Sequence, residues 1–195
     1  MIAIKGSLMV RKYIFMCLII LSIASPASGG QIGDVTLPDQ ITMAESTLTL
    51  NGLGMRTFTF FDVYAAGLYL ATPSTDAGKI LATDAPRGMT MHFLRKVEAE
   101  KIANAWLEGL AANTPAADAS LQERFTTLGT MMETMNTGET LDCLYDPASG
   151  TTVMVRGQLK GVIPGKDFND ALLACWIGPK PGPGEKFKAG ILGQR

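Results

Sequence analysis

The chain has 195 residues, of which 47% are hydrophobic and 18% are charged, so it is long enough to fold around one sizeable core. Residues 1–27 contain three basic residues and no acidic ones. This leaves 14 basic and 18 acidic residues after them, a net charge of −4. The acidic balance argues against a nucleic acid or an anionic membrane as a partner, because either would require a basic patch.

The first 30 residues have the pattern of a secretory signal. Arg11 and Lys12 precede an apolar run over residues 13–23, and small residues follow over residues 24–30. The alternative is a retained membrane anchor, for which the apolar run is short against a hydrocarbon layer of about 30 Å.

We therefore predict a signal peptide over residues 1–29, cleaved after Ala27 or Gly29, and a single domain over residues 30–195. Cleavage would leave no stable membrane span, and the protein would be periplasmic or secreted.

Cys143 and Cys175 would then lie in an oxidising compartment, where a disulfide is possible. We favour two separate buried thiols, because free cysteine packs as a small hydrophobic residue. His92 is the only histidine and no CxxC or HxxH spacing occurs, so we predict neither a metal site nor a cofactor.

The stretch Leu50–Leu70 is the most apolar part of the domain. Gly52 and Gly54 permit either a positive φ or a close backbone approach, and we interpret them as a hairpin corner. From Phe58 to Leu70 apolar residues occupy both faces, which predicts a central strand covered on both sides.

Other segments have clear periodicity or turn residues. We predict, in chain order, a helix over residues 77–83, a strand over 89–97, a helix over 98–113, a second helix starting at Thr114–Pro115, two strands around 146–150, a return strand at 162–163, and helices over 167–177 and 185–192. Strands and helices segregated in this way favour an α+β fold with an antiparallel sheet.

Arg56 lies just before the predicted central strand and has the chemistry of a carboxylate clamp, with Tyr64 as a second donor. The alternative is an arginine paired with a buried acid such as Asp62. Tyr64 and Tyr69 are five residues apart, so in a regular strand they face opposite sides.

For three other polar residues and one helix we favour a structural role over a functional one. We interpret Arg95 and Lys96 as solvated charges beside a helix start, and His92 as a packed or surface residue. The apolar stripe of the helix over 98–113 is interpreted as core.

Four segments together resemble bacterial chalcone isomerase-like proteins: GLGMR, FxxVYAAGLYL, MHFLRKV and GVIPGKDFNDALLACWIG. The resemblance extends over roughly residues 48–193. The superfamily also includes plant chalcone isomerases and plastid fatty-acid-binding proteins. It implies an open-faced β-sandwich, in which a layer of helices covers an antiparallel sheet and the ligand lies in the cleft between them.

The resemblance also implies a set of cleft residues. Arg56 matches the cleft arginine that holds the carboxylate in the fatty-acid binders, and Tyr64 stands where the enzymes have a threonine. Cys175 and Trp176 align with two cleft residues of the late helix. We therefore predict Arg56, Tyr64, Cys175 and Trp176 as ligand-binding residues, and no catalytic residue.

Two further polar residues of the enzymes are missing from this sequence. Their active-site tyrosine aligns near Glu98, where this sequence has no tyrosine, and their asparagine is replaced by Ala105. The sequence thus favours a secreted, non-catalytic protein that binds a small hydrophobic or amphipathic carboxylate such as a fatty acid. One alternative is an isomerase acting on a chalcone-like aromatic enone. Another is a structural or accessory envelope protein with a filled cleft.

Overall fold

The computed structural model describes residues 29–43 and 45–194 of the chain. The predicted signal peptide lies outside the described residues, except for Gly29, the first residue of strand β1. Cleavage after Ala27 would leave β1 whole, whereas cleavage after Gly29 would remove its first residue. No helix within the described ranges is long and apolar enough to cross a membrane.

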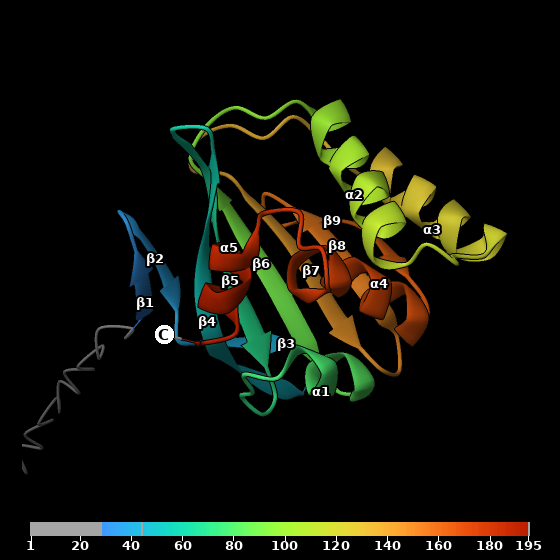
Figure 1. Cartoon of the computed structure of the whole chain (residues 1–195). Helices are drawn as coiled ribbons and strands as arrows, with labels where there is room; N and C mark the ends of the chain where they lie inside the picture. The colour runs from blue at the N-terminus through green and yellow to red at the C-terminus, as the bar shows by residue number, and fades with distance from the viewer. Residues whose placement is uncertain (1–28, 44, 195) are drawn as a thin grey trace, which may run out of the picture.

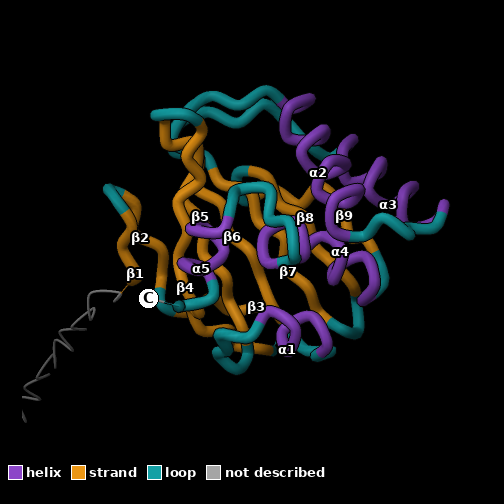
Figure 2. Tube along the Cα trace, viewed as in Figure 1, coloured by secondary structure: helices purple, strands orange, loops and turns teal. Residues whose placement is uncertain are grey.

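A seven-stranded antiparallel sheet forms the centre of the fold (Figure 1, Figure 2). Its strands lie side by side in chain order, from β3 to β9, while a separate hairpin, β1–β2, packs against β4. The strands are β1 (Gly29–Ile32), β2 (Val35–Pro38), β3 (Gln40–Met43), β4 (Ser46–Phe58), β5 (Phe61–Leu70), β6 (Arg87–Phe93), β7 (Thr140–Asp146), β8 (Gly150–Val155) and β9 (Gln158–Ile163).

Helices from the connections between strands, and from the chain after β9, cover one face of the sheet (Figure 1). α4 is buried at most positions because it contacts the other four helices as well as β8. This arrangement confirms the predicted α+β fold. The helices are α1 (Ala77–Ala82), α2 (Ala99–Asn113), α3 (Ala119–Thr130), α4 (Lys166–Ile177) and α5 (Glu185–Ile191).

Gly52 and Gly54 do not form the predicted hairpin corner, because β4 runs through both of them and neither has a positive φ. They instead allow α5 to approach β4 closely. A Cβ on Gly52 would lie 2.3 Å from the carbonyl oxygen of Gly190, and one on Gly54 would lie 2.7 Å from Cδ2 of Phe187. Close approach is therefore the reason for these glycines.

The β4–β5 hairpin turns at Thr59 and Phe60, inside the run that predicted one strand. Thr59 has a φ of 57°, which is rare for a β-branched residue, so no ordinary turn residue marks the position. The predicted start of the central strand at Phe58 is thus wrong. Its second half is right, since Ala65 to Leu70 are all buried and β5 lies between β4 and β6.

The second predicted helix starts later than Thr114–Pro115. Thr114 ends α2, and its N–H donates to the carbonyl oxygen of Leu110 at 2.7 Å. α3 begins after Asp118, whose carboxylate accepts a hydrogen bond from the backbone N–H of Leu121 at 2.8 Å. The loop contains two residues of capping type, and the aspartate forms the cap.

The main core lies between the sheet and the helices, and a smaller cluster lies between the sheet and the β1–β2 hairpin. Cys143 and Cys175 belong to the main core and are free, which confirms the interpretation as two buried thiols. Burial raises the pKa of each thiol to about 12, so both remain protonated and unreactive at neutral pH.

Candidate functional site

A cavity of about 630 Å³ lies between the sheet and helices α2 and α4. Its volume is within the range of about 300–1,000 Å³ that is typical of small-molecule sites. Exposed lining residues come from the end of β4, from Lys96 before α2, from α2 itself and from the segment 180–183, so the cavity opens between these elements. The lining residues are Arg56, Phe58, Val63, Tyr64, Met91, Phe93, Arg95, Lys96, Val97, Lys101, Ile102, Ala105, Trp106, Glu108, Gly109, Ala112, Cys175, Trp176, Lys180, Gly182 and Pro183.

The four residues predicted to bind ligand, Arg56, Tyr64, Cys175 and Trp176, all line this one cavity. Arg56 on β4 is the register partner of Tyr64 on β5, so the two occupy neighbouring positions on the sheet. Cys175 and Trp176 lie near the end of α4, on the helical side. The fold therefore places the predicted cation and phenol opposite the predicted helix residues.

The Arg56 guanidinium is held by a single backbone contact. Its Nη1 donates to the carbonyl oxygen of Gly182 at 2.9 Å. Within residues 29–43 and 45–194 it forms no ion pair, and Asp62 instead accepts a hydrogen bond from the hydroxyl of Thr57 at 2.7 Å. The alternative pairing of Arg56 with Asp62 is therefore absent from the described structure, and most of the guanidinium donors are available to a ligand.

The neighbours of Tyr64 fix its ring and donate to its hydroxyl oxygen, so the hydroxyl proton is left to donate to a ligand. Nε1 of Trp176 donates to the Tyr64 hydroxyl oxygen at 3.2 Å. The ring packs against Phe93 and Phe187, with centroids 5.7 and 5.9 Å away. Burial raises the pKa of Tyr64 to about 12, against the smaller lowering effects of Trp176 and Arg56, so the hydroxyl remains a donor at neutral pH.

Cys175 contributes shape to the cavity wall. Its thiol is buried and donates to the carbonyl oxygen of Ala171 at 3.5 Å. It faces Gly109 of α2, where an added Cβ would lie 2.6 Å from the sulfur. The close approach of α2 to α4 at this point therefore depends on a small residue in α2.

The apolar wall includes residues that sequence patterns assign to the core. Ile102 and Trp106 of α2 are buried, as predicted, yet both also line the cavity. The rings of Trp106 and Trp176 meet edge to face, with centroids 5.2 Å apart. Trp106 Nε1 is a buried N–H without a partner among the described residues. Periodicity cannot distinguish a core side chain from one at a cavity wall, because both are turned away from water.

Four cations besides Arg56 line the cavity, namely Arg95, Lys96, Lys101 and Lys180, against one carboxylate, Glu108. Arg95 and Lys96 precede the start of α2, as expected, and the Lys96 side chain is 62% exposed, but the predicted end of the strand at Val97 is wrong. β6 ends at Phe93, and the chain then leaves the sheet, so the two side chains no longer alternate. The end of β6 could have indicated that both cations lie at the cavity, but the alternating sequence pattern continues past Phe93 and does not show where the strand ends.

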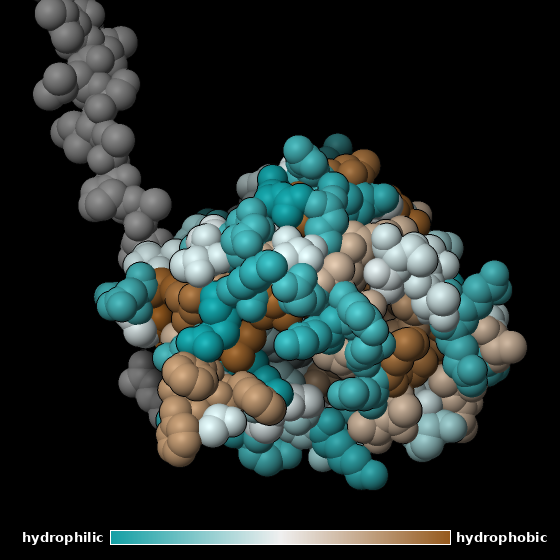
Figure 3. Space-filling view, turned by 90° about the horizontal axis from the view of Figure 1, so that it is seen from above, coloured by the Kyte–Doolittle hydropathy of each residue, from teal (hydrophilic) through white to brown (hydrophobic). Residues whose placement is uncertain are grey.

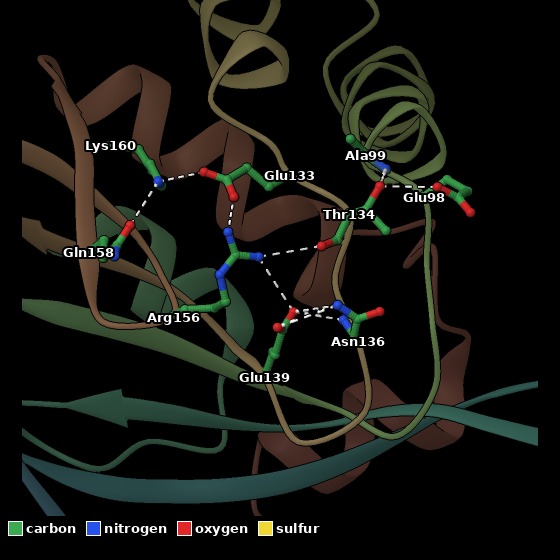
Figure 4. Close-up of polar contacts among 9 residues, drawn as sticks. All are labelled: Glu98, Ala99, Glu133, Thr134, Asn136, Glu139, Arg156, Gln158 and Lys160. Atoms are coloured by element: carbon green, nitrogen blue, oxygen red, sulfur yellow. Dashed lines mark hydrogen bonds and ion pairs between the residues drawn. The ribbon is translucent and has the colours of Figure 1, made fainter.

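A polar network holds the segment between β6 and α2, which forms part of the cavity wall (Figure 4). Arg156 forms ion pairs with Glu133 and Glu139, which ties the loop before β7 to the β8–β9 turn. The Thr134 hydroxyl donates to Glu98 at 3.0 Å and accepts the first backbone N–H of α2 at 3.3 Å. The loop thereby holds the segment between β6 and α2, which carries two of the mouth cations.

Several residues considered from the sequence lie outside the cavity. Tyr69 lies on the other side of the sheet, where its hydroxyl donates to the carbonyl oxygen of Pro38 at 2.8 Å. This agrees with the prediction that Tyr64 and Tyr69 face opposite sides. His92 and Glu98 also do not line the cavity, whereas Ala105 lines it with a methyl group.

The fold and the cavity place the chain in a structural class in which a layer of helices packs on an antiparallel sheet and a cavity lies between the two layers. The sequence model of the chalcone isomerase-like family matches residues 29–193, and the chain therefore belongs to this family. The structure is similar to the crystal structure of a fatty-acid binding protein from Arabidopsis thaliana. The TM-score is 0.62 and the identity 20%, over 81% of this chain and 91% of that one. This likeness concerns the fold, and no curated protein matches the sequence.

Proposed function

We propose that the chain is an exported bacterial protein that binds a small amphipathic carboxylate, such as a fatty acid, without catalysing a reaction. The name of the Arabidopsis relative supports this ligand class. The proposal rests mainly on one observation, the availability of the Arg56 guanidinium in the wall of an apolar cavity.

The donors around Arg56 match a carboxylate. A guanidinium has five N–H donors, and a carboxylate accepts two of them side by side. Because the Tyr64 oxygen already accepts a hydrogen bond from Trp176, the Tyr64 proton is free to donate to the ligand. A carboxylate bound here would be held by charge and by donors from two adjacent strands.

The remaining wall suits an alkyl chain. Met91 and Phe93 of β6 and Ile102 and Trp106 of α2 are buried apolar residues that line the cavity. Burial of apolar surface stabilises a bound chain by about 25 cal/mol per Å², without any directional requirement. Such a wall selects for an apolar tail and tolerates different lengths.

The alternatives from the sequence fit the cavity less well. A filled cleft with Arg56 paired to an acid would favour an accessory envelope protein, whereas this cavity is open. An isomerase needs polar groups around the reacting atoms, and Ala105 supplies none. Turnover of a panel of chalcones above the uncatalysed rate would favour the isomerase over the binding protein.

The test compares laurate with its methyl ester, which has the same tail and no charge. The two tryptophans of the chain, Trp106 and Trp176, both line the cavity, so intrinsic fluorescence reports its occupation. We expect the wild type to prefer laurate. Arg56→Met should weaken laurate binding about 10- to 100-fold, because a hydrogen bond to a charged group contributes about 1.5–3 kcal/mol.

The control is Arg124→Met, which removes an arginine that pairs with Asp167 and does not line the cavity. Its laurate affinity should equal that of the wild type, and the affinity of Arg56→Met for the methyl ester should be unchanged. Laurate binding that survives Arg56→Met at full strength would overturn the carboxylate clamp.

Export to the periplasm or the cell exterior is also part of the proposal, supported by the pattern of residues 1–29. N-terminal sequencing of protein recovered from a secreting bacterial host should find a chain that starts at Ser28 or Gly30. A chain that retains Met1 would contradict it.

A further inference from the structure

Three exposed phenylalanines form the tip of the β4–β5 hairpin. Phe58, Phe60 and Phe61 are 64%, 89% and 56% exposed, and they lie within four consecutive residues. The tip stands at the upper left in Figure 1. Figure 3 looks down on this end and shows pale brown apolar groups at its lower left, beside teal hydrophilic groups. Such a cluster at a protruding turn is unusual for a surface that meets only water.

Cations surround this tip. The Arg95 guanidinium lies over the Phe61 ring, 4.5 Å from its centroid, and its Nε donates to the carbonyl oxygen of Asp62 at 2.8 Å. Arg56 precedes the tip on β4, and Lys96 follows Arg95. The cavity that Phe58 helps to line has five cations and one carboxylate in its wall. The apolar tip and an excess of positive charge therefore share one end of the molecule.

Acidic residues in the same region reduce this excess but do not cancel it. Glu98 pairs with Lys96 at 2.8 Å, and Asp62 lies in the hairpin itself. The net charge of −4 after residue 27 argued against an anionic membrane. A net charge is a sum over the whole chain, however, and it does not show where on the surface the charges lie. The structure shows the basic patch that the composition conceals.

The shape of the tip favours a lipid bilayer over a protein partner. The three rings together expose on the order of 400 Å². A stable protein interface requires about 800 Å² on each partner and a broader surface. A bilayer requires only apolar side chains that reach the acyl boundary, with cations at the level of the headgroups.

We propose that the tip formed by Phe58, Phe60 and Phe61 inserts into the interfacial layer of a bilayer that contains anionic phospholipids. Arg95 and Lys96 then meet the headgroup phosphates. This orientation places the cavity mouth at the membrane surface, so an amphipathic molecule passes between bilayer and cavity without crossing water. The docking itself is independent of which molecule the cavity takes.

The test places an environment-sensitive fluorophore at the tip through Phe60→Cys, in the chain that starts at Gly29 and therefore lacks the apolar N-terminal run. This chain contains the whole family match and the entire described core, and a cooperative melt checks its folding. Cys143 and Cys175 are buried and do not compete for the label. The control is Ser149→Cys, at an exposed turn at the opposite end of the sheet.

We expect a blue shift of the Phe60→Cys label with vesicles of phosphatidylcholine and phosphatidylglycerol, and none at Ser149→Cys. Added salt should reverse the shift. Equal shifts at both positions, no shift at the tip, or an equal shift on pure phosphatidylcholine would overturn the proposal. So would a vesicle-independent shift with a doubled mass in light scattering, which would identify the tip as a dimer surface.

A second measurement uses unlabelled protein and vesicle flotation. Replacement of all three phenylalanines by serine should reduce the vesicle-bound fraction at least about tenfold, because the inserted apolar area is lost. The matched control replaces Leu159 and Val162, two exposed apolar residues of β9, by serine and should float like the wild type. Unchanged flotation of the triple variant would also overturn the proposal.

Discussion

Two arginines of the same sheet, Arg87 and Arg56, lie at opposite ends and in opposite environments. Arg87 begins β6 and is 3% exposed. Its Nε donates to Asn169 at 2.6 Å, its Nη1 donates to the carbonyl oxygen of Ile80 at 2.8 Å, and it forms an ion pair with Asp170. Arg56 has one backbone contact and an open cavity beside it.

The difference shows how one residue type serves structure at one end and remains available at the other. α4 supplies Asn169 and Asp170 to Arg87, and with Ile80 they give each guanidinium nitrogen a partner within the fold. A buried charge without such partners is strongly destabilising. Arg56 avoids that cost because its end of the sheet opens to solvent. We call the two regions the closed end and the open end.

The largest expected effect separates the two ends by stability. Arg87→Met should lower the free energy of unfolding by about 3 kcal/mol, because Asn169 and Asp170 lose their main partner, although Asp170 keeps Lys166 at 2.6 Å. Arg56→Met should change it by less than about 1 kcal/mol. Urea unfolding followed by circular dichroism measures both, and equal losses would erase the distinction.

An intermediate effect tests how the open end is held together. The end of α5 rests on β4 at Gly52, and the segment before α5 contacts β4 through the carbonyl oxygen of Gly182, which accepts a hydrogen bond from Arg56. Gly52→Ala should cost about 2 kcal/mol, because its Cβ would meet the backbone oxygen of Gly190 at 2.3 Å. The control Gly182→Ala meets only a carbonyl oxygen at 3.7 Å and should be near neutral. If the thermal melts of the two variants coincide, the close approach of α5 to β4 does not contribute to stability.

The smallest expected effect concerns the charge balance of the open end. Glu108 is the single carboxylate among the described cavity residues, and Glu108→Gln should raise laurate affinity about two- to threefold at low salt. Added salt should remove the gain. Glu123→Gln, on the exposed side of α3 and away from the cavity, should have no effect. A gain that persists in high salt would not be electrostatic.

The sequence by itself determined the α+β class, most helices and the apolar character of β5. These follow from local periodicity and from turn chemistry, which act over a few residues. Residue chemistry indicated Arg56 with Tyr64, and family resemblance added Cys175 and Trp176; the structure places all four around one cavity.

Only the tertiary structure decided the rest, because it depends on contacts between distant segments. The glycines of β4 resembled a turn until α5 was seen to pack on them. The sequence does not distinguish Arg87 from Arg56, because the residues next to a charged side chain do not show whether the fold will bring a partner to it. Their roles depend on α4, whose first half supplies partners to Arg87, whereas its last residues form a cavity wall and leave the Arg56 guanidinium available.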